Sequence, residues 1–209
     1  RLLTRGVSPQ LMSAVTLEEK DLAPSRTQGA QLLFIVPWTA LLVAVYGAFA
    51  VAIDVTAGER ERGSLEPLLV NPIHTWQLAL GKWIVVTLNA CAIVTLTLLG
   101  FVVAMRFIAS ETLAALMQLQ WREVWIFALL LMPFAALMAA VNMLAATFGR
   151  TYKEAQTYVS YIAMAVQFSA VIPVFLTTRD AAWLAAVPSV GQLTVMLKTV
   201  RGEALGSYE

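Results

Sequence analysis

The densest group of charged residues in the chain is the run Gly58-Glu59-Arg60-Glu61-Arg62-Gly63-Ser64-Leu65-Glu66-Pro67-Leu68-Leu69. Alternating acidic and basic side chains form ion pairs across an interface, and leucines add apolar contact area. The chemistry that this run favours is recognition of a partner rather than catalysis. Taken by itself, a solvated charged segment beside a membrane is the simpler interpretation.

Residues suited to catalysis or to metal binding are few. His74 is the only histidine and Cys91 the only cysteine, so the sequence has neither a His-x-x-x-His motif nor a cysteine cluster. It also lacks a Gly-x-Ser-x-Gly elbow and a glycine-rich loop ending in Lys-Ser or Lys-Thr. We therefore predict that the chain is not an enzyme and that it holds no metal and no cofactor of its own.

Long apolar runs surround these residues. Hydrophobic residues make up 59% of the chain and charged residues 13%, with a mean hydropathy of +0.75, whereas a soluble domain is about 25% charged. The net charge of +1 gives no support to nucleic-acid binding. Uncharged runs long enough to cross a hydrocarbon core of roughly 30 Å cover Gln31–Ile53, Trp83–Met105, Val124–Phe148 and Thr157–Thr178. We predict an all-α integral membrane fold with about four transmembrane helices.

Neutral polar residues lie inside these runs and are candidates for lining a translocation path: Thr87, Cys91, Thr95, Asn142, Ser160 and Gln167. The alternative is that each one hydrogen-bonds a neighbouring helix or its own backbone. We favour this alternative for each residue taken singly. The small residues Ala44, Ala48 and Ala52 follow at four-residue spacing, which indicates close helix packing or a dimer seam, and packing is favoured.

Two shorter helices are expected outside the spans. Ser110 to Trp121 places Leu113, Leu116 and Met117 near one face, which predicts a small interfacial helix. Ser189 to Gln192 has the capping-box pattern. Apolar residues then follow at helical spacing, which predicts an amphipathic helix lying on the membrane or dipping into it: Leu193, Met196, Leu197 and Val200.

The charged run also indicates a family. Glu59 to Glu66, followed by Leu68-Leu69, Pro72 and Gly81-Lys82, resembles the signature of the membrane subunits of type-two ABC exporters, closest to their sodium-efflux permease branch. Weaker resemblances are Lys153-Glu154-Ala155-Gln156 and the segment Pro188–Gly202.

The sequence departs from the family pattern at two positions of this run. Ser64 stands where threonine is usual, and Pro67 follows Glu66. Because proline is tolerated in the first turn of a helix, we predict that Ser64 caps a helix beginning at Leu65.

The resemblance implies an organisation for the chain. Residues 1–29 would end an external region, residues 30–178 would supply helices two to five of a six-helix permease, and residues 179–209 would be external. A first helix would precede the chain and a last helix would follow it. A coupling loop over residues 54–82 would face the cytoplasm, which charge counting alone leaves open.

The resemblance also implies partners. A separate ABC ATPase would bind ATP and Mg, and a second permease copy or a homologous permease would complete the exporter in the cell membrane. Coupling to the ATPase would involve Glu59, Arg60, Glu61, Arg62, Gly63, Ser64, Leu65, Glu66, Leu68, Leu69, Pro72, Lys153 and Glu154. Sodium or a small molecule would be exported.

Two other functions stay open for the chain. A membrane scaffold or assembly protein would have the same spans without transport. A secondary transporter usually needs ionisable groups inside its spans, and these spans have none. Stimulation of a partner ATPase distinguishes an ABC permease from both.

Overall fold

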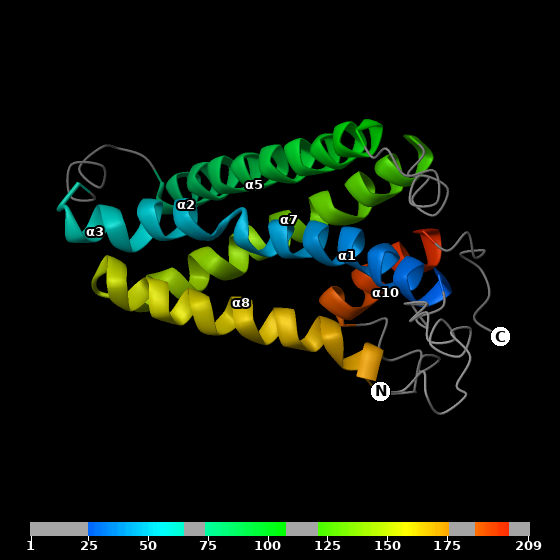
Figure 1. The fold of residues 1–209 in the computed structure, drawn as a ribbon. Coiled ribbons are helices and arrows are strands. Elements are labelled where there is room, and N and C mark those ends of the chain that lie inside the picture. Colours follow the sequence, from blue (N-terminus) through cyan, green and yellow to red (C-terminus); the bar gives the residue numbers. More distant parts are fainter. Residues whose placement is uncertain (1–24, 65–73, 108–120, 176–186, 201–209) are drawn as a thin grey trace, which may run out of the picture.

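The computed structural model describes residues 25–64, 74–107, 121–175 and 187–200. Within these residues the chain is a bundle of helices without strands (Figure 1). In chain order the helices are α1 Ser25–Tyr46, α2 Phe49–Ile53, the π-helical turn η3 Asp54–Gly58, α3 Glu59–Glu61, α5 Thr75–Arg106, α7 Trp121–Phe148, α8 Tyr152–Phe175 and α10 Pro188–Val200.

The long helices coincide with the predicted spans. In the described part of the chain, three helices are long and apolar enough to cross a membrane, over Phe34–Glu61, Thr75–Ala104 and Trp121–Phe148. The fourth predicted span coincides with most of α8, a helix of 24 residues that is not among these three. The predicted all-α integral membrane fold is confirmed. The predicted interfacial helix lies outside the described residues, except for Trp121 at the start of α7.

The first span is a broken helix that continues into the charged run. A turn at Gly47–Ala48 separates α1 from α2, and η3 and α3 then prolong the helix to Glu61. Figure 1 shows α1, α2 and α3 following one another along the bundle, beside α5. The loop predicted over residues 54–82 is therefore helical at both ends, because α5 already begins at Thr75.

Glycine ends this helix by a specific arrangement of backbone hydrogen bonds. Gly63 has φ of +71°, a left-handed conformation that glycine adopts without strain. The Ser64 amide donates to the Glu59 carbonyl at 3.1 Å and the Gly63 amide to the Arg60 carbonyl at 3.2 Å, which together form a Schellman motif. Ser64 thus closes the preceding helix, while the helix predicted from Leu65 lies outside the described residues.

Small residues allow the helices to pack closely. Ala44, Ala48 and Ala52 are completely buried within the single chain, as are Ala135 and Ala139 of α7. Their burial confirms that this four-residue spacing serves packing inside the chain, since short side chains let neighbouring backbones approach.

The helix near the C-terminal end is part of the bundle, and its position on the membrane or dipping into it stays a prediction. Its residues Leu193 and Met196 are buried in the same core as α1, α7 and α8. The predicted capping box is wrong, because α10 already begins at Pro188. Ser189 therefore lies inside the first turn, where its hydroxyl is 2.7 Å from that of Ser169 on α8.

Candidate functional site

The charged run reaches the end of α7 through Arg60. Its Nη1 donates to the carbonyl oxygens of Thr147 and Gly149, each at 3.1 Å. These carbonyls lie at the C-terminal end of α7, where backbone oxygens lack partners in the next turn and the helix dipole is negative. A guanidinium group is well suited to this position, because it presents several donors and a permanent positive charge.

The next residue along the chain reaches the start of α8. Glu61 accepts a hydrogen bond at Oε2 from the backbone N–H of Tyr152, the first residue of α8, at 2.6 Å. The N-terminal end of a helix offers free N–H groups and a positive dipole, so a carboxylate is favoured there. Consecutive residues of α3 therefore bind the two helix ends that flank the α7–α8 turn.

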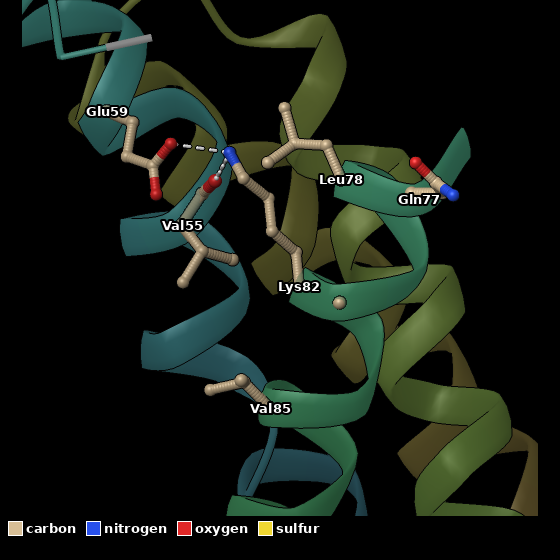
Figure 2. Close-up of a pocket in the computed structure, with 7 residues that line it drawn as sticks. Val55, Glu59, Gln77, Leu78, Lys82 and Val85 are labelled. Atoms are coloured by element: carbon tan, nitrogen blue, oxygen red, sulfur yellow. Dashed lines mark hydrogen bonds and ion pairs between the residues drawn. The ribbon is translucent and has the colours of Figure 1, made fainter. Parts of the chain in front are cut away.

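A third contact of the charged run is made to α5. Lys82 Nζ donates to Glu59 Oε2 at 2.5 Å and to the Val55 carbonyl at 2.7 Å. The two side chains are only 15% and 20% exposed, so the pair is largely shielded from water. Figure 2 shows Lys82 extending from α5 across a cleft toward the first helix. The cleft is lined by Val55, Glu59, Gln77, Leu78, Gly81, Lys82 and Val85.

Arg62 makes a local contact instead. It pairs with Asp54 at 2.9 Å on the same stretch of helix, and both side chains are more than half exposed. The hydrogen bond that Arg62 donates to the Asp54 carboxylate raises the pKa of Arg62 above its ordinary value. Ser64 Oγ donates to the Glu59 carbonyl at 3.2 Å. Of the other residues assigned to coupling, Leu65, Glu66, Leu68, Leu69 and Pro72 lie outside the described part of the chain.

The α7–α8 turn is closed by its own capping residues. Glu154 accepts from the backbone N–H of Arg150 at 2.8 Å, and Thr151 Oγ1 accepts from the Glu154 N–H at 3.3 Å. The bond from Arg150 is the main reason why the pKa of Glu154 lies below its ordinary value. Lys153 is exposed. The structure therefore brings Glu154 close to the charged run through the turn that Arg60 and Glu61 bind.

The candidate pathway residues lie on three helices and make separate contacts. Thr95 and Ser160 donate to carbonyls four residues earlier in their own helices. Gln167 accepts from the Tyr46 hydroxyl at 3.1 Å. Such contacts agree with the alternative that each residue hydrogen-bonds a neighbouring helix or its own backbone. A role in lining a translocation path stays a prediction. Cys91 packs against the core, while the buried Thr87 hydroxyl has no hydrogen-bond partner.

Asn142 belongs to a second polar contact, at the break in the first helix. Its Nδ2 donates to the Val45 carbonyl at 3.4 Å, and Asn89 Nδ2 donates to the Gly47 carbonyl at 3.0 Å. A helix interruption leaves carbonyls without partners in the next turn, and inside a membrane neighbouring side chains must supply the donors. Asn142 is completely buried, so this contact is shielded from water.

Sequence reasoning did not assign roles to Lys82, Asn89 or the α7–α8 carbonyls. The sequence does mark both residues, because Lys82 stands in the family-like Gly81-Lys82 pair and Asn89 is a polar residue within a span. Neither feature predicts which helix the side chain contacts. Among the described residues, no group of three or more His, Cys, Asp or Glu side chains is placed to hold a metal ion.

Comparison with known proteins identifies the family. Residues 7–197 match the model of the ABC-2 family transporter proteins. The chain belongs to this family. This ABC-2 chain is 28% identical over 179 residues to the ABC transporter permease protein NatB of Bacillus subtilis, covering 84% of the chain and 45% of NatB.

A shorter match of 41% identity over 49 residues links the ABC-2 chain to the probable multidrug ABC transporter permease YbhR of Escherichia coli. It covers 23% of the chain and 13% of YbhR. The chain thus spans less than half the length of these curated relatives. No solved structure gives a significant match. These findings make the chain part of an ABC transporter permease subunit, a multi-pass membrane protein.

Proposed function

We propose that the chain forms the central part of the permease of an ATP-driven exporter in the cell membrane. The observation that carries the proposal is the charged end of the bundle, where Glu59, Arg60 and Glu61 link the first helix to three others. A segment bound in this way passes a force from a partner outside the membrane to the helices within it. Membership of the ABC-2 family supports such a partner.

The partner that we propose is a separate ABC ATPase that binds ATP and Mg and is coupled to the permease through residues 58–70. A second permease copy or a homologous permease would complete the translocation path. From Gln31 to Thr178, ionisable residues occur only at span ends and between spans. A proton-coupled carrier would normally keep such groups at membrane depth. This distribution supports ATP as the energy source.

The described part of one short connection that the resemblance assigns to the cytoplasm lies against the other such connection, at one end of the bundle. Arg60 and Glu61 contact the turn between α7 and α8 directly, which is the arrangement required if residues 60–76 and 150–156 share one side of the membrane. We propose that this end faces the cytoplasm and the ATPase. For the substrate we propose sodium or a small molecule, and the name of YbhR, a probable multidrug permease, favours the small molecule.

The test uses the full-length permease with its ATPase in proteoliposomes. ATP-dependent transport should persist in the presence of an uncoupler. Leu68→Asp should weaken ATPase binding roughly 30-fold, because a charge replaces an apolar anchor at an interface. Gln156→Asp is the matched control: it adds the same charge at an exposed position near the same end of the bundle, and should leave binding unchanged.

Other outcomes identify the alternatives. Transport driven by an imposed pH gradient without nucleotide would identify a secondary transporter. A correctly inserted protein that binds no ATPase and transports nothing with ATP would identify a scaffold. Normal ATPase binding and transport by Leu68→Asp would contradict the coupling role of this segment.

A further inference from the structure

The charges of Arg60 and Glu61 match the two helix ends that they contact. Arg60 binds carbonyl oxygens at the negative end of α7, and Glu61 binds an N–H group at the positive end of α8. Arg60 precedes Glu61 in the chain, just as the end of α7 that Arg60 binds precedes the start of α8 that Glu61 binds. Hydrogen bonds with one ionised partner are about twice as strong as neutral ones, so both helix ends are held firmly.

The turn between these helix ends has little room to change shape. A Cβ atom at Gly149 would lie 2.4 Å from the backbone nitrogen of Ala155 and 2.6 Å from its Cα. The turn therefore packs directly on the first part of α8. Since Arg60 binds the Gly149 carbonyl itself, movement of α3 must displace this turn or break the hydrogen bond.

The link to α5 completes the arrangement. Glu59 binds Lys82, and Lys82 also binds the Val55 carbonyl of the first helix. Consecutive residues of α3 thus contact α5, α7 and α8 in turn, and we call Glu59, Arg60 and Glu61 the charged staple. The carboxylate of Glu61 and the guanidinium of Arg60 are already engaged within the chain.

We infer that Arg60 and Glu61 are positioning residues, which transmit movement of the coupling segment to the α7–α8 hairpin and do not bind the ATPase. The inference rests on the proposed function for the source of that movement. It divides the charged run into two parts. The charged staple acts inside the permease, and the residues beyond Gly63 meet the partner.

Arg62 provides the matched control for this inference. It lies beside the charged staple and carries the same charge as Arg60, yet its partner is Asp54 on its own stretch of helix. A general effect of charge near the ATPase would appear equally in Arg60→Ala and Arg62→Ala. An effect transmitted through the hairpin would appear only in Arg60→Ala and Glu61→Ala.

The experiment measures substrate transported per ATP hydrolysed, together with ATPase co-purification, for the full-length permease with its ATPase. Glu61→Ala should lower the transport ratio roughly tenfold, the effect of losing one charged hydrogen bond, while ATPase co-purification stays normal. Glu61→Gln should restore most of the ratio, because the amide oxygen still accepts from the Tyr152 N–H. Arg62→Ala should leave the transport ratio of the bound complex unchanged, whatever it does to ATPase co-purification, because Arg62 pairs with Asp54 on its own stretch of helix.

A second measurement on the permease without ATPase tests the staple independently of the proposed function. Spin labels at Ser64→Cys and Gln156→Cys, in a Cys91→Ser background, report the separation of α3 and α8. The distance distribution should broaden in Glu61→Ala and recover in Glu61→Gln. If the wild type fails to transport but this broadening occurs, only the proposed function is refuted. Loss of ATPase binding in Glu61→Ala with an unchanged distance distribution would overturn the inference, as would an unchanged transport ratio.

Discussion

In two regions of the first helix, side chains hydrogen-bond backbone groups at helix ends or at a helix break, but the chemistry of the two regions differs. At its water-facing end, the charged staple and Lys82 satisfy backbone groups of α7, α8 and the helix itself. At the Gly47 break, the neutral amides of Asn89 and Asn142 donate to backbone carbonyls. In both regions the contacts lead to α5 and α7, so the same neighbours hold the helix at two levels.

The difference follows from the cost of placing charge at each level. A charged side chain at the centre of a membrane costs at least about 2.5 kcal/mol, whereas at the membrane surface water and counter-charges reduce that cost. An amide supplies a donor without a charge. Helix ends near water are therefore held by strong ionic hydrogen bonds, and the break within the membrane is held by weaker neutral ones.

The largest expected effect comes from placing a charge at the deep contact. Asn142→Asp removes the donor to Val45 and introduces an ionisable group at a completely buried position. It should lower the free energy of unfolding by about 3 kcal/mol, measured by denaturant unfolding in detergent. Asn142→Leu is the control, and should cost only about 1 kcal/mol. Equal stability of Asn142→Asp and wild type would remove the distinction between the two regions.

A smaller effect is expected from the turn that the charged staple binds. Gly149→Ala places Cβ against the backbone of Ala155 and should cost about 2 kcal/mol. The melting temperature of the purified protein measures this loss. Gly81→Ala is the matched control, since a Cβ there meets no atom within 4 Å, and it should not destabilise α5. A Gly149→Ala protein as stable as wild type would show that the turn is not tightly packed.

The smallest effect concerns pH and should arise at the water-facing end. The pKa of Glu154 is lower in the folded protein than its ordinary value of 4.5, chiefly because its carboxylate accepts the Arg150 N–H. Its contribution to stability is therefore present above about pH 4.5, and is lost as pH falls through the folded pKa. Melting temperature measured against pH should show this loss in wild type.

Glu154→Gln tests the assignment of this pH effect. The variant should lack that part of the pH dependence, because it has no carboxylate to protonate at this cap. The amides of Asn89 and Asn142 do not titrate and should contribute nothing below pH 4.5. The same acid-induced loss in wild type and Glu154→Gln would place the titrating group elsewhere.

Much of the fold follows from local sequence patterns. Uncharged runs of about 20 residues predict membrane helices, because only helices satisfy their own backbone there. The runs containing Pro37 and Pro133 are helical in the structure, as predicted. The charged run predicts a polar end, since its side chains require water. The capping-box pattern predicts that Ser189 caps the last helix, whereas α10 begins at Pro188. The prediction is wrong because proline also favours the first position of a helix.

The partners of the charged and amide side chains were beyond local patterns. Arg60 binds carbonyls 87 and 89 residues away, and Glu61 binds an N–H group 91 residues away. Such pairs depend on which helix ends meet in space, which sequence spacing does not encode. The amphipathic pattern of α10 likewise marks an apolar face without saying whether protein or lipid covers it.

By itself, then, the sequence determined that this protein lies in a membrane, that its helices are apolar and that one connection is highly charged. These properties depend on the solvent that each segment requires, and solvent preference is a local property of the side chains. Only the tertiary structure decided that Arg60 and Glu61 hold the α7–α8 hairpin, and that Asn89 and Asn142 hold the helix break. The physical reason is that a hydrogen bond requires two groups within about 3 Å, and folding alone brings together groups so distant in the chain.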